Sequence, residues 1–481
     1  MKKYFYLFLV ILCVACDKTL QTTTSLDVQF QSSTWSVASK DIVCKWNLVI
    51  KQTFEVANYN KDTFCLYMGK TNNFFANYLE EWTHLDHSKP YDEDMEKFAK
   101  NFKLIINGID YSKSCVYENS TLAFSLPKRK KHNIEIQYLM TSYCWILPFI
   151  YNYVPTSVYT QDLYSCDDVA KYEQWYFSTD NMEWKKVTIH SPNDNTTILA
   201  NYPLKKEGND YIFDFKLAKK EDGLWFSVFE ENLYTKNQYR INNTTFNFYS
   251  QKYFDVDSVG NLTDIHAEPD SIITKDLQAT QAICENIVHL FDDTIHRTLN
   301  IFQGDFGNGR CSGFISKNHN YVILLDTSRF DEDYYAQKWH HEFIHCFLSY
   351  PNDDDKKTLY LFTEGMVVYL DYCLYHRNDS ISELDKHFER NYASLSEEVK
   401  NTPIFYLDRS ADYQVIYTKS AYIIYQLAKR IGVEKFNTIL KNYYAVLNAN
   451  GDYVTLDGFE EFLKTNGVFN EDWEYFISLL S

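Results

Sequence analysis

Trp339-His340-His341-Glu342-Phe343-Ile344-His345-Cys346-Phe347 is the stretch of this chain with the most specific chemical pattern. His341 and His345 are four residues apart, so on a helix their imidazoles project from one face, one turn apart. Zn²⁺ accepts neutral imidazole nitrogens in a tetrahedral arrangement. Glu342 lies beside the pair, where it can take a proton from an activated water without being a ligand. The stretch therefore predicts two zinc ligands and a general base; a structural pair of buried histidines is the alternative.

A second acidic element, Thr363-Glu364-Gly365, follows this stretch. Glu364 lies 364 − 345 = 19 positions after His345 and precedes a mostly apolar helical segment. Two His from one helix and a Glu from the next leave the fourth tetrahedral position for water, so we predict one catalytic Zn²⁺ on these three residues. Asp371 lies 371 − 364 = 7 positions further on, two helical turns along the same face. We expect it to accept the second ring N–H of a zinc-bound His, with a simple surface acid as the alternative.

HExxH, eighteen intervening residues and a Glu-Gly that opens an apolar helix resemble the aminopeptidase N family of gluzincin zinc metallopeptidases. Downstream, Tyr417-Thr418-Lys419-Ser420-Ala421 is similar to that family's Y-x-K-G-A segment. The resemblance implies that Tyr417 donates its phenolic O–H to the developing oxyanion. It covers roughly Asp270 to Ser481 and implies a thermolysin-like catalytic domain. More loosely, the preceding region would stand for the family's β-rich saddle domain.

Two features differ from that family. Its exopeptidase signature, G-x-M-E-N, belongs upstream of HExxH, where this chain reads Gly307-Asn308-Gly309-Arg310-Cys311-Ser312-Gly313-Phe314-Ile315. The backbone at Gly309 and Gly313 can line a substrate cleft, but the acid that grips a free amine is missing from this stretch. The family's long C-terminal helical domain is also missing from the sequence, so we expect longer or internal peptide segments as substrates. Collagenase-type gluzincins, with a typically longer spacing to Glu, are the second model of the site.

The first sixteen residues are expected to be a targeting segment. Tyr4 to Ala15 is an almost unbroken apolar run with the length of a signal-peptide core, too short to span a bilayer. Cys13-Val14-Ala15-Cys16 resembles a bacterial lipobox, so we predict lipidation at Cys16, with ordinary secretion as the alternative. The protein is then exported, as a lipoprotein that faces the periplasm or the cell surface. The lipid is its only expected contact with a membrane.

The length of 481 residues suits two or three domains. Residues 17–30 are polar and Thr-rich, which predicts a flexible tether. Short alternating runs between turn residues predict a β-rich domain over 31–265. Residues 266–481 are predicted to be mainly helical, with a helix from Asp276 to Leu299 and one extended segment at Tyr321 to Leu325. The fold class is therefore α+β.

Charge and motif content exclude several other functions. The net charge of −18 argues against nucleic acid as a partner, because nothing basic offsets phosphate repulsion. Neither a G-x-S-x-G elbow nor a phosphate-cradling Gly-rich loop is present. The sequence thus predicts a zinc metallopeptidase acting on a peptide or protein. The alternatives are a catalytically inactive binding protein with a peptidase fold, a collagenase-like endopeptidase, and a hydrolase of glycan-linked peptides.

Overall fold

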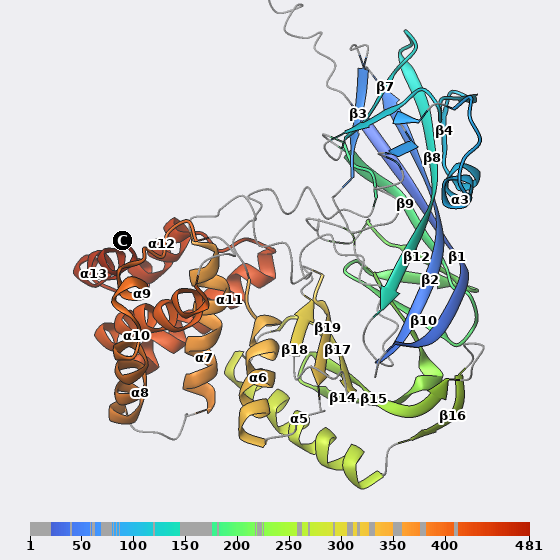
Figure 1. The fold of residues 1–481 in the computed structure, drawn as a ribbon. Helices are drawn as coiled ribbons and strands as arrows, with labels where there is room; N and C mark the ends of the chain where they lie inside the picture. Colours follow the sequence, from blue (N-terminus) through green and yellow to red (C-terminus); the bar gives the residue numbers. More distant parts are fainter. Residues whose placement is uncertain are drawn as a thin grey trace, which may run out of the picture. The chain divides into compact units, whose positions relative to one another are not determined.

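A computed structural model gives the fold of the protein (Figure 1). It describes residues 21–38, 41–57, 59, 63–68, 79, 81–82, 84–85, 87–118, 121–144, 176–179, 182–216, 218, 224, 226–256, 262–267, 270–291, 294–304, 311–314, 318–326, 332–349, 358–375, 381–407 and 412–481. The chain divides into two units, and for the residues described the division falls between Phe229 and Glu230.

The first unit is built on an eight-stranded sheet with the order β11-β12-β9-β1-β2-β8-β4-β5. Its three long strands, β1, β2 and β8, pair antiparallel, whereas β9 joins β1 in parallel. Alternate residues of the long strands are buried in the core, such as Leu48 and Ile50 of β2 and Ile134 and Ile136 of β8. The bounds are β1 (Gln21–Ala38), β2 (Asp41–Ala57), β4 (Lys103–Ile106), β5 (Ile109–Asp110), β8 (Lys131–Cys144), β9 (Met182–His190), β11 (Leu204–Glu207) and β12 (Asp210–Phe213).

Two smaller sheets and the helix α3 (Glu93–Asn101) also belong to this unit. The strands β3 (Thr63–Tyr67), β7 (Thr121–Ser125) and β6 (Val116–Glu118) form one sheet, and β10 (Thr196–Ala200) pairs with β13 (Phe226–Glu230). Asp92 precedes the helix α3 and caps it, because its carboxylate accepts the N–H of Met95 at 2.8 Å. All three sheets contribute to one hydrophobic core.

The predicted tether is wrong from Gln21 onward, because this residue begins β1. Thr22 and Thr24 are each 1% exposed, and they alternate with half-buried residues as in any half-buried strand. The Thr24 hydroxyl donates to the carbonyl of Thr53 at 3.2 Å, which offsets the cost of burying it. Polar composition suggested a solvated linker, but Thr also favours strands when its hydroxyl finds a partner. Residues 1–20, Cys16 included, lie outside the described residues.

A histidine bridges three strands of the eight-stranded sheet. His190 on β9 contacts Asp210 on β12 through Nδ1 at 2.7 Å and Asp27 on β1 through Nε2 at 2.8 Å. Burial alone lowers the pKa of His190, but its hydrogen bonds to the two carboxylates and their charges outweigh burial, so the pKa is raised. Lys51, which pairs with Asp27 in the register, forms its own ion pair with Glu135 at 3.0 Å.

We expect this bridge to stabilise the protein at low rather than high pH. A raised pKa in the folded state gives a contribution that is fully present below the ordinary histidine pKa of about 6.5 and is lost as pH rises through the folded value. The urea midpoint of wild type should therefore exceed that of His190→Gln at acidic pH, with the difference shrinking toward pH 8. The exposed His84→Gln serves as the control; an equal pH trend there would contradict the prediction.

The second unit contains a six-stranded sheet with the order β14-β15-β17-β19-β18, in which β16 also pairs with β15. The strands β15, β17 and β19 run parallel, and β18 lies antiparallel at the edge. The helices α5 and α6 lie beside these strands in Figure 1 and contact them. The bounds are η1 (Glu231–Leu233), β14 (Tyr234–Ile241), β15 (Thr244–Val256), β16 (Leu262–Ala267), α5 (Asp270–Phe291), β17 (Arg297–Gly304), β18 (Cys311–Phe314), β19 (Asn320–Asp326) and α6 (Glu332–His345).

The structure differs from the predicted boundary at 265/266 and from the predicted helix over 276–299. Strand β15 pairs in parallel with β17, so the hairpin before α5 belongs to the second unit. Alternation predicted strands there but could not tell which sheet they join. The helix α5 ends at Phe291, and Leu299 is a core residue of β17. Leu299 continued the helical spacing of apolar residues by coincidence, because a buried parallel strand such as β17 is also rich in apolar residues.

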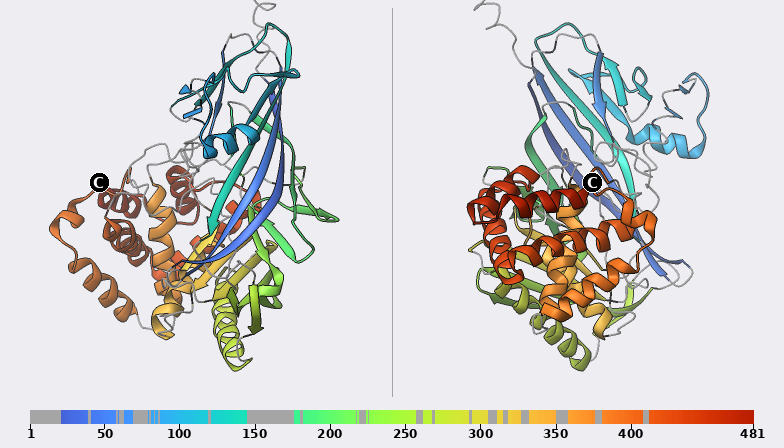
Figure 2. Two further views of the ribbon diagram at one scale, coloured as in Figure 1. Left: turned by 45° about the vertical axis from the view of Figure 1, so that its right-hand side comes forward. Right: turned by 90° about the vertical axis from the view of Figure 1, so that its left-hand side faces the viewer.

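The rest of the second unit is helical (Figure 2). It comprises the π-helical segments η2 (Leu361–Gly365) and η3 (Gln414–Lys419) and the helices α7 (Met366–Tyr375), α8 (Ile381–Ala393), α9 (Glu397–Asn401), α10 (Ser420–Ile431), α11 (Val433–Asn450), α12 (Leu456–Thr465) and α13 (Asn470–Leu480). One hydrophobic core joins these helices to the sheet. Among the described residues, no helix combines the length and the apolarity needed to cross a membrane. The α+β prediction is confirmed: a β-rich unit is followed by a largely helical one.

Candidate metal centre

His341 and His345 lie in the last turns of α6, one helical turn apart as the sequence spacing predicts. Their Nε2 atoms are 3.0 Å apart, and the two rings are nearly perpendicular. Neighbouring residues of α6, Trp339, Phe343 and Ile344, are buried in the core. Core packing therefore fixes the rotation of α6, and this rotation sets the direction of both imidazoles.

Glu364 comes from the next element, η2, and meets the two histidines. Its Oε2 lies 3.2 Å from Nε2 of His341 and 3.5 Å from Nε2 of His345. Tetrahedral zinc with ligand bonds of about 2.0–2.1 Å would separate its ligand atoms by about 3.3–3.4 Å. The three observed separations lie around this value, and two nitrogens with one carboxylate oxygen are a donor set that zinc accepts. The residues therefore fit a zinc ion.

Charges within the cluster shift the pKa values of its residues. Burial raises the pKa of Glu364, but the charges and hydrogen bonds of His345 and His341 outweigh it and hold the pKa well below its usual range. Glu364 is therefore a carboxylate at neutral pH. Burial lowers the pKa of His345, but Glu364 and Glu342 outweigh it and raise the pKa. Two carboxylates facing one imidazole make the site attractive to a cation.

The end of α6 that carries His345 is capped by two buried polar side chains. Arg297, at the start of β17, donates from Nε to the carbonyl of Cys346 at 3.2 Å, and its guanidinium lies over the ring of Phe347. Asn448 of α11 donates to the carbonyl of Phe347 at 2.8 Å. The last carbonyls of a helix lack intrahelical partners, and a cation beside them is favourable. These contacts fix the position of the ligand turn.

Glu342 and Tyr417, the predicted base and oxyanion donor, both lie beside the cluster. Glu342 is half-buried on α6, and its charge contributes to the raised pKa of His345. Tyr417 is in η3, and its ring centroid lies 6.0 Å from that of His341. The structure thus brings together five predicted site residues from three elements of the second unit: His341, Glu342, His345, Glu364 and Tyr417.

Asp371, the predicted orienting acid, is buried on α7. Its Oδ1 lies 3.8 Å from Nδ1 of His340, the residue that precedes the ligand pair. Burial lowers the pKa of His340 to about 4, so this imidazole is neutral at pH 7. The contact between Asp371 and His340 was not predicted from the sequence. The position of His340 directly before HExxH was the one feature of the sequence that could have indicated it. That Asp371 orients a ligand histidine remains a prediction.

The predicted cleft glycines are only partly covered by the structure. Gly313 lies in β18, opposite Ile323 of β19, on the edge strand of the sheet. Gly309 lies outside the described residues. The helix α6 packs against β18, so the edge strand and the metal ligands share one part of the second unit.

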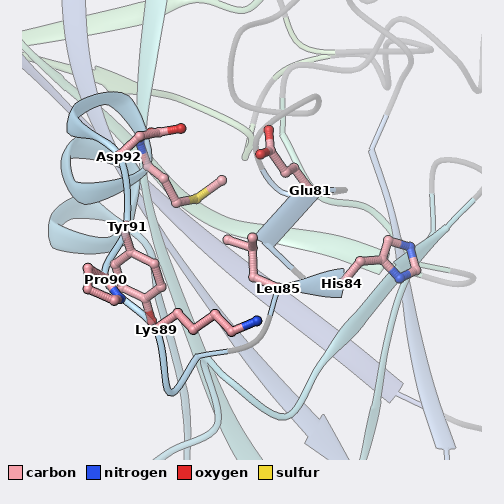
Figure 3. Close-up of a pocket in the computed structure, with 8 residues that line it drawn as sticks. Glu81, His84, Leu85, Lys89, Pro90, Tyr91 and Asp92 are labelled. Atoms are coloured by element: carbon pink, nitrogen blue, oxygen red, sulfur yellow. The ribbon is translucent and has the colours of Figure 1, made fainter.

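A surface pocket of about 300 Å³ belongs to the first unit (Figure 3). Its lining mixes both charges with apolar side chains: Glu81, His84, Leu85, Lys89, Pro90, Tyr91, Asp92 and Met95. Within the described parts of the chain, only the three residues in the second unit gather ligand atoms for a metal. The pocket therefore offers no second metal site among those residues.

Three solved structures illustrate what this fold is similar to, although no family profile and no curated protein matches the sequence. An aminopeptidase N family protein from Idiomarina loihiensis shares 12% identity at a TM-score of 0.54, over 94% of this chain and 75% of that one. An M1 zinc metallopeptidase from Deinococcus radiodurans shares 10% identity at a TM-score of 0.50, over 96% of this chain and 93% of that one. Legionella pneumophila aminopeptidase A shares 14% identity at a TM-score of 0.51, over 97% of this chain and 50% of that one. The chain therefore has the fold of M1 zinc metallopeptidases.

Proposed function

We propose that this chain is a zinc-dependent metallopeptidase that hydrolyses peptide bonds. The observation that carries the proposal is the separation of the three ligand atoms, 3.0, 3.2 and 3.5 Å, which suits tetrahedral zinc. The fold supports it, because the similar solved structures include zinc metallopeptidases and aminopeptidases. His341, His345 and Glu364 would hold the ion.

Zinc bound there would polarise the scissile carbonyl and acidify the attacking water. Glu342, which is not among the three ligands, takes the proton from that water and later delivers it to the leaving amine. Tyr417 donates its hydroxyl to the oxygen that becomes negative. Asp371 is proposed to support the orientation of the ligand histidines through α6.

The edge strand β18 suggests how a peptide would bind. No described strand pairs with its outer edge, which can therefore pair with an extended substrate backbone, and Gly313 lets that backbone approach closely. We propose internal as well as terminal cleavage, because the stretch around Gly313 lacks the acid that would hold a free amine. We also propose that the protein is exported and anchored through a lipid on Cys16.

The test is zinc content measured together with cleavage of a mixed peptide library. We expect one zinc per chain, and the positions of the cuts separate trimming of N-termini from internal cleavage. Stoichiometric zinc without any cleavage would favour an inactive binding protein or a non-peptide substrate. A chain purified without zinc, and unable to take it up, would overturn the site itself.

Tyr417→Phe should lower kcat about tenfold to a thousandfold and leave zinc content unchanged, because only the oxyanion donor is removed. KM should change little, since this hydrogen bond strengthens as charge develops. Steady-state kinetics and metal analysis check both expectations. Tyr413→Phe is the matched control: its side chain is 67% exposed at the start of the same π-helical segment. An unchanged kcat in Tyr417→Phe would remove this residue from the mechanism.

A further inference from the structure

Two π-helical segments carry site residues. Glu364 lies in η2 and Tyr417 in η3. The N–H of Met366 bonds to the carbonyl of Leu361, and the N–H of Ser420 bonds to that of Val415; both reach five residues back. Such turns are rare and concentrate at functional sites. The two segments pack against each other in the second unit.

The two segments meet at Gly365 and Ser420. A Cβ added to Gly365 would lie 2.5 Å from Cβ of Ser420 and 3.3 Å from its carbonyl carbon. Both residues are buried, and Ser420 is 0% exposed. Gly365 is not among the residues with positive φ, so close approach rather than backbone conformation requires glycine here. Glu364 is the immediate neighbour of this contact.

Ser420 also holds the turn that carries Tyr417. Its hydroxyl donates to the carbonyl of Val415 at 3.0 Å, the same carbonyl that its own N–H contacts. The carbonyl of Val415 therefore accepts two hydrogen bonds from Ser420, and the hydroxyl reinforces the π turn that the N–H closes. One residue therefore supports the turn of Tyr417 and touches the residue after Glu364.

We propose that Gly365 and Ser420 are positioning residues, whose contact sets the distance between the Glu364 carboxylate and the Tyr417 hydroxyl. The inference rests on the proposed function and deepens it. In the proposed mechanism the Glu364 carboxylate binds the metal while the Tyr417 hydroxyl contacts the reacting oxygen. A change in the distance between η2 and η3 would therefore move one of these groups away from its partner. Misplacement by about 1 Å can cost about a hundredfold in rate.

Gly365→Ala is the first test. The new Cβ cannot fit against Ser420, so the segments must move apart, and we expect zinc affinity to fall about tenfold and kcat to fall about a hundredfold. Adding Ser420→Gly removes the opposing Cβ, and the double variant should recover most of the lost zinc affinity. Ser420→Ala keeps that Cβ, so combining it with Gly365→Ala should give no recovery. Chelator competition and the visible spectrum of bound Co²⁺ report the metal site independently of turnover.

Gly458→Ala is the matched control. Its Cβ would lie 2.8 Å from Oγ1 of Thr455, a comparable overlap in α12 that involves no proposed site residue. We expect it to lower thermal stability without changing zinc affinity or kcat. If Gly365→Ala does not fold, Ser420→Ala alone decides: loss of its hydroxyl should lower kcat at unchanged zinc affinity.

The outcomes separate this inference from the function on which it rests. Suppose that wild type binds zinc and cleaves peptides. The positioning role alone is then overturned if the Gly365→Ala, Ser420→Gly variant does not recover zinc affinity, or if Ser420→Ala leaves kcat unchanged. Wild type that binds no zinc overturns the proposed function and the inference together. Recovery of the Co²⁺ spectrum specific to the Ser420→Gly combination supports both.

Discussion

Glu342→Gln is expected to abolish peptide cleavage while one zinc per chain stays bound. The side chain is not among the three ligands, and the amide has nearly the same size as the carboxylate, so the metal centre should keep its shape. An amide cannot accept the proton of the attacking water, and loss of a general base typically costs about 10²–10⁴-fold in rate. Single-turnover cleavage of the best library peptide, with metal analysis on the same sample, measures both quantities.

Glu434→Gln is the matched control for this variant. It makes the same chemical change at an exposed position of α11, in the same unit, and should cleave like wild type. A Glu342→Gln protein that still turns over would remove Glu342 from the base role. Loss of zinc from the same variant would instead make it part of the metal site.

Glu364→Gln is expected to remove zinc and activity together. A neutral amide oxygen is a weaker ligand than a carboxylate, and the two histidines alone leave the ion incompletely held. Loss of an outer-shell partner costs about 10–100-fold in metal affinity, and loss of a direct ligand should exceed this range. Titration with Zn²⁺ against a fluorescent chelator gives the affinity, and cleavage should return only at high zinc concentration.

The Glu434→Gln protein serves again as the control and should bind zinc as wild type does. A second comparison uses circular dichroism to confirm that Glu364→Gln remains folded. If the folded variant keeps wild-type zinc affinity, the cluster of His341, His345 and Glu364 is not the metal site, and the proposed function fails with it.

The centre of the site was predictable because it depends on local geometry. Residues four apart on a helix share a face, so His341 and His345 had to lie together once α6 formed. Glu364 was predicted from its place before an apolar helix and strengthened by the family resemblance, but nineteen positions of spacing do not determine how two elements pack. The structure brings its carboxylate to both imidazoles.

Packing against distant residues was not predictable from the sequence. The polar stretch from Gln21 was expected to be solvated, and it became a strand because β2 and β9 offered it partners on both sides. The hairpin of β14 and β15 was assigned to the first domain because alternation does not reveal a parallel partner fifty residues later, here β17. The π turns at Glu364 and Tyr417 were not predicted, because the helical periodicity of the sequence does not distinguish a π turn from an α turn.

The early start of β1 would limit the distance between the folded chain and a membrane, if Cys16 carries the lipid that we propose. With Gln21 already paired to Ala57, the chain from a lipidated Cys16 to the folded body would have four intervening residues, or 21 − 16 = 5 Cα–Cα steps. Fully extended, it reaches at most about 18 Å. That reach is less than half of the roughly 40–45 Å thickness of a whole bilayer. In the lipoprotein that we propose, the first unit would therefore lie close to the bilayer surface. The peptides that the protein encounters most often would be those that diffuse along that surface.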